Sequence, residues 1–216
     1  GTNSYGGTTT ISSGTLQVGA GGTAGTLGTG GVTNNAALAF NRSDALTVAN
    51  TISGTGTLTQ AGSGTTSLAG ANTYSGTTTI SAGTLQVGAG GTAGTLGTAG
   101  VTNNAALAFN RSDAITVANT ISGAGALTQI GTGTTSLTGA NTYSGTTTIS
   151  AGTLQVGTGG TSGTLGTGAV VNNAALAFNR SDAVTVANAI SGTGALTQLG
   201  TGTTSLTGAN TYSGTT

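Results

Sequence analysis

The chain is a tandem repeat, in which one long unit recurs almost without change. Equally spaced tyrosines mark the interval, at Tyr5, Tyr74, Tyr143 and Tyr212. Residues 7–75, 76–144 and 145–213 form three gapless copies, and the partial ends 1–6 and 214–216 belong to the same pattern. The first two copies differ at only 8 of 69 positions. Because a repeated unit buries its apolar residues mainly against its neighbours, this pattern predicts a fold in which successive units stack.

A shorter period lies inside each copy. In the middle copy three apolar series advance together, each in two steps of similar length followed by one longer step. The series are Ile80, Val101, Ile121 and Ile149; Leu85, Leu107, Leu127 and Leu154; and Leu96, Val117, Leu137 and Leu165. Series that advance in parallel indicate a β-solenoid with three short strands per turn and three turns per repeat. We expect Gly139–Gly145 to lengthen the third turn as an insert.

Apolar residues also occur two positions apart, which places both members of a pair on one face of a strand. We expect these pairs to point inward: Leu85 and Val87, Leu107 and Phe109, Ile115 and Val117. We expect Thr84, Gln86 and Thr116 to point outward. Between the strands lie glycine-rich corners such as Gly88–Gly94, where a positive φ costs little.

The composition favours strands and excludes several classes of function. Thr, Val and Ile favour strands, whereas the 43 glycines favour turns. Only 3% of the residues are charged, the net charge is zero, and His and Cys are absent. We therefore expect no nucleic-acid partner, no membrane insertion by this segment, and no cofactor or metal. The expected fold is an all-β, right-handed parallel β-helix that runs as a single continuous segment through residues 1–216, with the handedness following from the usual crossover rule.

The segment Gly123–Gly157 contains a distinctive series of spaced positions: Gly131, Gly133, Leu137, Gly139, Asn141, Tyr143, Gly145, Thr147, Ile149, Gly152, Thr153, Leu154 and Val156. At these positions the segment resembles the autotransporter-associated β-strand repeat (passenger-associated repeat) of bacterial autotransporter and adhesin passenger domains. The block recurs at Gly54–Gly88, and Gln129 occupies the position of the family's lysine. The resemblance implies a right-handed parallel β-helix that is secreted to the surface of a Gram-negative bacterium, where such passengers support adhesion, aggregation or biofilm formation.

All the side-chain charge of the chain lies in three Arg–Asp pairs, which are the candidate site residues. They are Arg42 with Asp44, Arg111 with Asp113, and Arg180 with Asp182. Glycoside hydrolysis needs two carboxylates within about 5–10 Å of each other, whereas three turns would separate successive aspartates by roughly 14 Å. We therefore expect each pair to be a local salt bridge at a solvated turn. The alternative is a row of surface contacts along the solenoid, for a sugar or a protein partner.

Asparagines and tyrosines form a second group of candidates. The asparagines of interest are Asn103, Asn104, Asn110, Asn119 and Asn141. We expect them to stabilise tight turns, through left-handed backbone geometry or through side-chain hydrogen bonds to the backbone, with glycan binding as the alternative. Tyr74 and Tyr143 are expected to pack over the insert of the third turn rather than to form an aromatic platform for sugars.

Together these features predict a non-catalytic scaffold, the rod-like stalk or shaft of a secreted or surface-displayed adhesin of autotransporter type. No base is present to activate a hydroxyl group, so we expect no enzyme. The expected partners are copies of itself, end to end or side by side, and glycans or proteins of host or bacterial surfaces. One alternative is a self-assembling extracellular filament, because open sheet edges pair with other chains. A minor alternative is an ice-binding solenoid, with a threonine column formed by Thr79–Ser81, Gly100–Thr102, Thr120–Ser122 and Thr148–Ser150.

Overall fold

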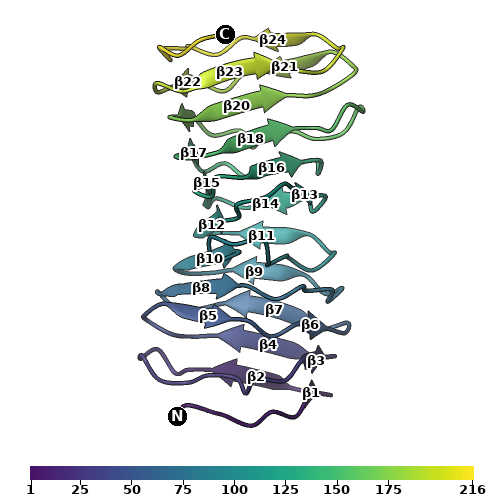
Figure 1. Cartoon of the computed structure of the whole chain (residues 1–216), viewed down its shortest axis with the longest axis vertical. Coiled ribbons are helices and arrows are strands. Elements are labelled where there is room, and N and C mark those ends of the chain that lie inside the picture. Colours follow the sequence, from purple (N-terminus) through teal and green to yellow (C-terminus); the bar gives the residue numbers. More distant parts are fainter. The chain divides into compact units, whose positions relative to one another are not determined.

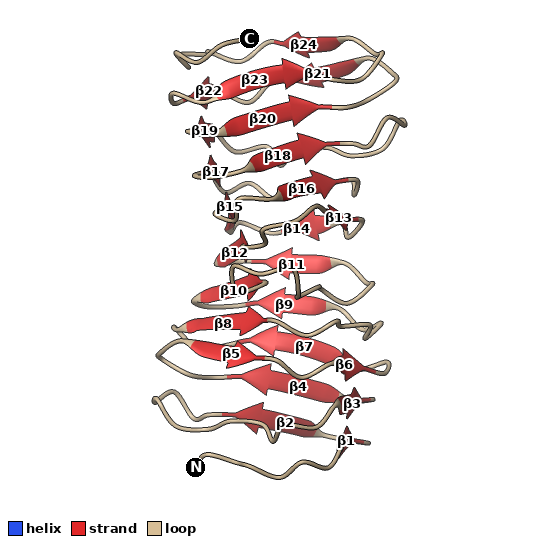
Figure 2. Cartoon of the chain, viewed as in Figure 1, coloured by secondary structure: helices blue, strands red, loops and turns tan.

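The computed structural model describes all 216 residues and contains strands and turns but no helix (Figure 2). No helix long and apolar enough to cross a membrane is therefore present. The chain divides into two compact units, Gly1–Ala108 and Phe109–Thr216. Each unit is a parallel β-solenoid in which strands of successive turns lie side by side (Figure 1). The predicted fold class is confirmed, with about 10 turns in total, whereas a single continuous segment over residues 1–216 stays a prediction.

Three parallel sheets form the walls of the first unit. The first sheet contains β1 (Thr9–Ile11), β3 (Val32–Asn34) and β6 (Ile52–Ser53). The second sheet contains β2 (Thr15–Val18), β4 (Ala37–Phe40), β7 (Thr57–Gln60), β9 (Thr78–Ile80) and β11 (Val101–Asn103). The third sheet contains β5 (Leu46–Val48), β8 (Thr65–Leu68), β10 (Thr84–Val87) and β12 (Ala106–Phe109), whose last residue begins the second unit.

The second unit has the same construction. One sheet contains β13 (Ile115–Val117), β16 (Thr134–Leu137), β18 (Thr153–Val156), β20 (Ala175–Phe178) and β23 (Ala195–Gln198). Another contains β15 (Ala126–Gln129), β17 (Thr147–Ile149), β19 (Val170–Asn172) and β22 (Ile190–Ser191). The remaining strands are the pair β21 (Val184–Val186) and β24 (Thr204–Leu206), and the short strand β14 (Ile121–Ser122).

Equivalent strands of successive copies lie in different sheets. Each copy therefore makes more than the three turns that the sequence predicts. β1 and β9 are equivalent in the repeat, yet β1 belongs to the first sheet and β9 to the second. Starting from Thr9, three turns lead through Val32 and Ile52 to Asn72. The residue equivalent to Thr9 is Thr78, which lies about a third of a turn further along the chain. Each copy therefore makes three turns and about one third, and the next copy starts one sheet further round.

The segment predicted to be an insert is part of a regular wall instead. Burial alternates through it, with Asn141, Tyr143, Thr147 and Ile149 buried and the intervening threonine and serine side chains facing outward. The apparent step from Ile121 to Ile149 is not one long turn, because the register partner of Ile149 in the preceding turn is Gln129. The longer turns arise at the glycine corners instead: Thr78 pairs with Val101 across a turn that contains Gly88–Gly94.

Inside each turn, apolar side chains stack on apolar side chains of the next turn. In the second unit Leu154, Leu176 and Leu196 are register partners in three successive turns. Of the residues expected to point inward, Leu85, Val87, Leu107, Phe109 and Val117 are buried, and Ile115 is half-buried. The predicted corner is also confirmed, with positive φ at Gly88, Gly90 and Gly94. The core is therefore a set of columns, each filled by one residue per turn.

Truncation of a column residue should destabilise the fold strongly. Leu176 is fully covered, and Leu176→Ala should lower the free energy of unfolding by about 2–5 kcal/mol, because it leaves a cavity between two leucines. Thr185→Ala on the outward side of β21 is the matched control and should change it by less than about 0.5 kcal/mol. Denaturant unfolding followed by circular dichroism measures both, and equal effects would contradict the assigned register.

Candidate functional site

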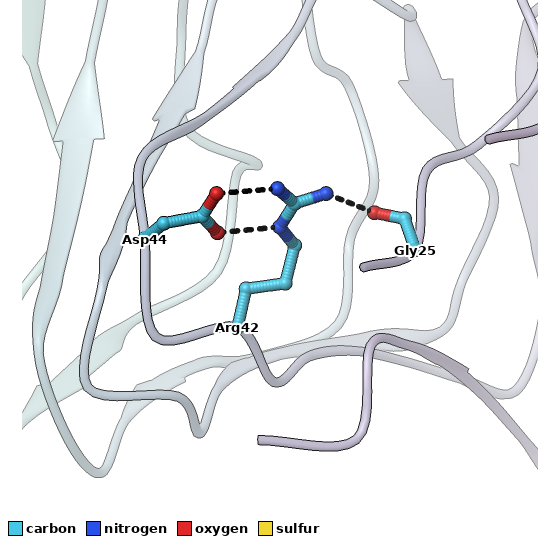
Figure 3. A network of polar contacts seen from close by, with 3 residues as sticks. All are labelled: Gly25, Arg42 and Asp44. Atoms are coloured by element: carbon cyan, nitrogen blue, oxygen red, sulfur yellow. Dashed lines mark hydrogen bonds and ion pairs between the residues drawn. The ribbon is translucent and has the colours of Figure 1, made fainter. Parts of the chain in front are cut away.

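Arg42 and Asp44 form a two-armed salt bridge at the corner that follows β4 (Figure 3). The Arg42 Nε donates to Oδ1 of Asp44 at 2.8 Å, and Nη2 donates to Oδ2 at 2.7 Å. The third nitrogen, Nη1, donates to the carbonyl oxygen of Gly25 in the preceding turn. The Arg42 side chain is only 10% exposed, whereas that of Asp44 is 38% exposed. The pair is therefore local, as predicted, but its arginine is covered and ties two turns together.

The loop below Arg42 has the backbone geometry that this contact requires. Gly19, Gly21 and Gly25 all have positive φ. A Cβ atom on Gly19 would overlap the Asn41 carbonyl oxygen and would lie 2.7 Å from the Arg42 Cγ. A side chain at Gly19 is therefore excluded both by its backbone conformation and by the arginine that packs over it.

The salt bridges shift the pKa values of their members in the direction that favours the charged forms. Hydrogen bonding to Asp44, together with its charge, raises the pKa of Arg42 above its ordinary value. Hydrogen bonding to arginine lowers the pKa of Asp44, Asp113 and Asp182 below 3.8, against a smaller opposing effect of burial. All three aspartates are therefore ionised at neutral pH and committed to their arginines.

The second unit contains two such pairs, and they do not lie in one row. Arg180 and Asp182 repeat the geometry of the first pair, with Nη1 of Arg180 donating to the buried carbonyl of Gly163. Arg111 and Asp113 form the same two-armed bridge. In the following turn, Gly131 packs against the backbone of Arg111 and Gly200 packs against the backbone of Arg180, so that neither position has room for a Cβ atom.

The rotation of the repeat by one sheet per copy puts these two corners on different edges of the solenoid. β13, which follows Arg111, lies in the sheet of β20 and β23, whereas its equivalent β21, which follows Arg180, pairs with β24. The predicted contact row is therefore wrong for the second unit, although contacts made by single pairs stay a prediction. No group of three or more His, Cys, Asp or Glu side chains lies together, and Asp113 and Asp182 do not share a site.

The asparagines hold neighbouring turns together through their side chains. Asn72 accepts a hydrogen bond from the backbone nitrogen of Ile52 in the preceding turn and donates to the carbonyl of Thr95 in the next turn, at 2.9 and 2.8 Å. Asn141 does the same with Ile121 and Thr164. The structural role predicted for the asparagines is confirmed for Asn103 and Asn141, through side-chain bonds alone, because every residue with positive φ is a glycine. It is not confirmed for Asn110, whose position makes no such bond.

Tyr74 and Tyr143 point into the interior and are completely covered. Each hydroxyl shares a 2.7 Å hydrogen bond with a buried threonine, Thr78 or Thr147. Burial raises the pKa of both tyrosines above 10.0. The predicted structural role is therefore right, although the tyrosines line the core instead of covering an insert, and an aromatic platform for sugars is ruled out at these positions.

The predicted threonine column does not form. On the second sheet of the first unit, the outward side chains of successive turns are Gln17, Ala39, Thr59, Thr79 and Thr102. In the second unit Thr148 lies between Thr128 and Val171. Each column thus mixes positions from different parts of the repeat, because successive copies are rotated.

The apolar patterns in the sequence miss a buried glutamine that occurs at the same place in the first two copies. Gln60 and Gln129 are almost completely covered, and the side-chain nitrogen of Gln60 donates to the carbonyls of Gly62 and Gly64 at 2.8 and 3.2 Å. The Oε1 atoms of both glutamines are buried without a protein partner. Strict alternation from Leu58 or Leu127 along the strand is the signal that places these glutamines inside.

A family model described as Passenger-associated-transport-repeat matches the chain at residues 1–18, 58–87, 127–156 and 196–216. The match at 58–87 begins in β7, continues through β8 and β9 and ends in β10. The match at 127–156 runs in the same way from β15 through β16 and β17 to β18. No curated protein and no solved structure matches the chain.

Arg180 should stabilise the fold mainly by binding the loop of residues 157–163, and less by its ion pair with Asp182. Arg180→Lys removes the fork that reaches Asp182 and the Gly163 carbonyl together, and an unpaired buried carbonyl costs about 1–3 kcal/mol. Asp182→Asn keeps the carbonyl contact and should destabilise the fold less. Hydrogen exchange of residues 157–163 measures the effect on the loop, which should open in Arg180→Lys alone; equal exchange in both variants would contradict the loop-binding role.

The free energy of unfolding should stay constant near neutral pH and should fall at both acid and alkaline pH. The folded-state pKa of each aspartate is lowered, so its contribution is present above 3.8 and is lost as the pH falls through the folded value. The folded-state pKa of each internal tyrosine is raised, so its contribution is present below 10.0 and is lost as the pH rises through the folded value. Melting temperatures across the pH range test this; Asp182→Asn should flatten the acid side and Tyr143→Phe the alkaline side.

Proposed function

This chain carries the passenger-associated transport repeat of autotransporter passenger domains, and from this we propose that it is a non-catalytic shaft segment of a bacterial adhesin. The adhesin would be secreted or displayed on the surface of a Gram-negative bacterium, with the shaft supporting adhesion, aggregation or biofilm formation. The family places passenger repeats outside the cell. Contacts of the shaft with surface glycans or proteins, and end-to-end association of copies, stay predictions.

The observation that carries this proposal is the interchangeability of the copies in the stack. Leu68 of the first copy pairs with Val87 of the second, and Leu137 of the second copy pairs with Val156 of the third, so the two junctions are equivalent. Any copy therefore offers its neighbour the same ladder of strands after a rotation of one sheet. A fold of this kind changes its length by whole copies without rebuilding its core, which is what a spacer requires.

The chemical inventory supports a structural role. The buried side chains of Asn72 and Asn141 bond to the backbone of neighbouring turns. The charged residues are used in pairs that bind loops, as Arg42 and Arg180 do. The side chains that are most reactive in other proteins, His, Cys, Lys and Glu, do not occur in the chain.

Removal of whole copies from the displayed protein tests the proposal. Deletion of residues 76–144, or of residues 7–144, rejoins the chain in phase and should leave folding and surface display intact. Each deleted copy shortens the stack by roughly 16 Å, at about 4.8 Å per turn. Cell adhesion or agglutination should therefore weaken with each deletion at an equal amount of displayed protein.

A deletion out of phase is the matched control. Removal of residues 76–110 joins Ser75 to Arg111 and breaks the stacking register, so this variant should fail to fold and should not be displayed. Adhesion that stays at the original level after in-phase deletion of two copies would contradict a role of the chain as a shaft.

A further inference from the structure

Each copy contains one asparagine that stands in the acceptor sequence for N-linked glycosylation. Asn41, Asn110 and Asn179 are each followed by arginine and serine, which completes the pattern Asn-x-Ser. None of the other asparagines has serine or threonine two positions later. The acceptor pattern therefore recurs once per copy, always at the corner that carries the Arg–Asp pair.

The side-chain amide at this position is available, unlike those of the other asparagines described above. The backbone of Asn41 is held on both sides, by Val18 in the preceding turn and by Gly21 of the glycine loop. Its side chain is half-buried and makes no hydrogen bond, and the same holds for Asn179. By contrast, the side chains of Asn50 and Asn72 bond to the backbone of adjacent turns.

An exposed apolar side chain lies next to the acceptor in the following turn. In the second unit Ile130 follows the strand that pairs beside Asn110, with its nitrogen bonded to the Phe109 carbonyl, and its side chain is 37% exposed. Leu199 occupies the same place beside Asn179. Ala61 is the equivalent residue beside Asn41. In two of the three copies a large apolar side chain therefore takes this place.

We propose that Asn41, Asn110 and Asn179 are N-glycosylated, and that the first sugar of each glycan covers the outward residue of the next turn. The glycosyl donor is a sugar whose anomeric carbon is bonded to a nucleoside diphosphate or a polyprenyl diphosphate. The amide nitrogen Nδ2 forms a bond to the anomeric carbon, the bond from that carbon to the diphosphate oxygen breaks, and Nδ2 gives up one proton to a base of the transferase.

The acceptor segment is modified before it folds. In the folded protein Arg42 is bound to Asp44 and to the Gly25 carbonyl, so the three acceptor residues cannot be drawn out together into a transferase. After folding, the glycans of the second unit leave from two different corners, those of Arg111 and Arg180, and do not crowd each other.

Mass spectrometry of the protein from the cells that naturally make it tests the proposal. Trypsin cleaves after Arg42, Arg111 and Arg180, so each of the first three peptides carries one acceptor asparagine next to its C-terminal arginine. All three peptides should carry sugar on that asparagine and on no other. Hexoses added one by one would indicate a nucleotide-linked donor, whereas one fixed oligosaccharide would indicate a lipid-linked donor. Unmodified asparagine in all three peptides would overturn the proposal.

Variants at Ser112 separate recognition from folding. Ser112→Ala should remove the glycan from Asn110 alone, and Ser112→Thr should retain it, because the acceptor pattern takes either hydroxyl. A glycan that persists in Ser112→Ala would show that the pattern is not what is recognised.

The contact between the sugar and the next turn has its own test. Enzymatic removal of the glycans should lower the melting temperature of the protein, and this loss should be smaller in Ile130→Ala, which has less apolar surface for the sugar to cover. An equal loss in both proteins would contradict the contact without affecting the modification site.

Discussion

The parallel hydrogen-bond ladder between successive turns is the constraint on which the rest of this structure depends. A parallel ladder fixes neighbouring turns about 4.8 Å apart and sets every inward side chain directly against its register partner. Leu154, Leu176 and Leu196 therefore form one column, and any residue that enters the interior must fit the residues before and after it. Some polar side chains enter where the backbone of an adjacent turn offers a partner, as for Asn72 and Asn141. Others find a partner in their own turn, as Tyr74 does with Thr78. The amide oxygens of Gln60 and Gln129 are buried without a protein partner.

The mismatch between repeat length and turn length decides where repeated residues lie. The copy is not a whole multiple of the turn, and because the turns lengthen at the glycine corners, each copy makes three turns and about one third. Equivalent strands such as β1 and β9 therefore fall in different sheets, and every column mixes residues from different parts of the repeat. A repeat of a whole number of turns would instead have aligned identical residues along one face, as a contact row or a lattice-matching threonine array needs. This protein distributes its repeated features around its circumference.

The sequence predicts the local structure of this chain better than its winding. Alternation of apolar residues correctly places Leu85, Val87, Leu107 and Phe109 inside, and the glycine clusters mark the corners with positive φ. The predicted number of turns per copy is too low because the sequence shows Ile121 and Ile149 as members of one apolar series, one turn apart. The segment between them contains Asn141, Tyr143 and Thr147, which are buried but do not count as apolar anchors. Side chains that enter a core through hydrogen bonds are invisible to a search for apolar periodicity. The same holds for Arg42 and Arg180, whose loop contacts lie 17 residues back along the chain.

The corner of each copy combines a bound arginine with a free asparagine, and the two have opposite consequences. Each of the three guanidinium nitrogens of Arg180 donates to Asp182 or to the Gly163 carbonyl, so the group stabilises the corner. The adjacent side chain of Asn179 is held by no hydrogen bond of its own, and Leu199 lies beside it in the next turn. In a solenoid whose other asparagines bond to adjacent turns, a free amide recurring at one place per copy has no structural task to perform. Its surroundings fit the proposed attachment point: the backbone on both sides is hydrogen-bonded, the side chain is half-buried, and an apolar residue lies one turn away. Within the second unit the rotation of the copies places Asn110 and Asn179 at different corners and not in one row.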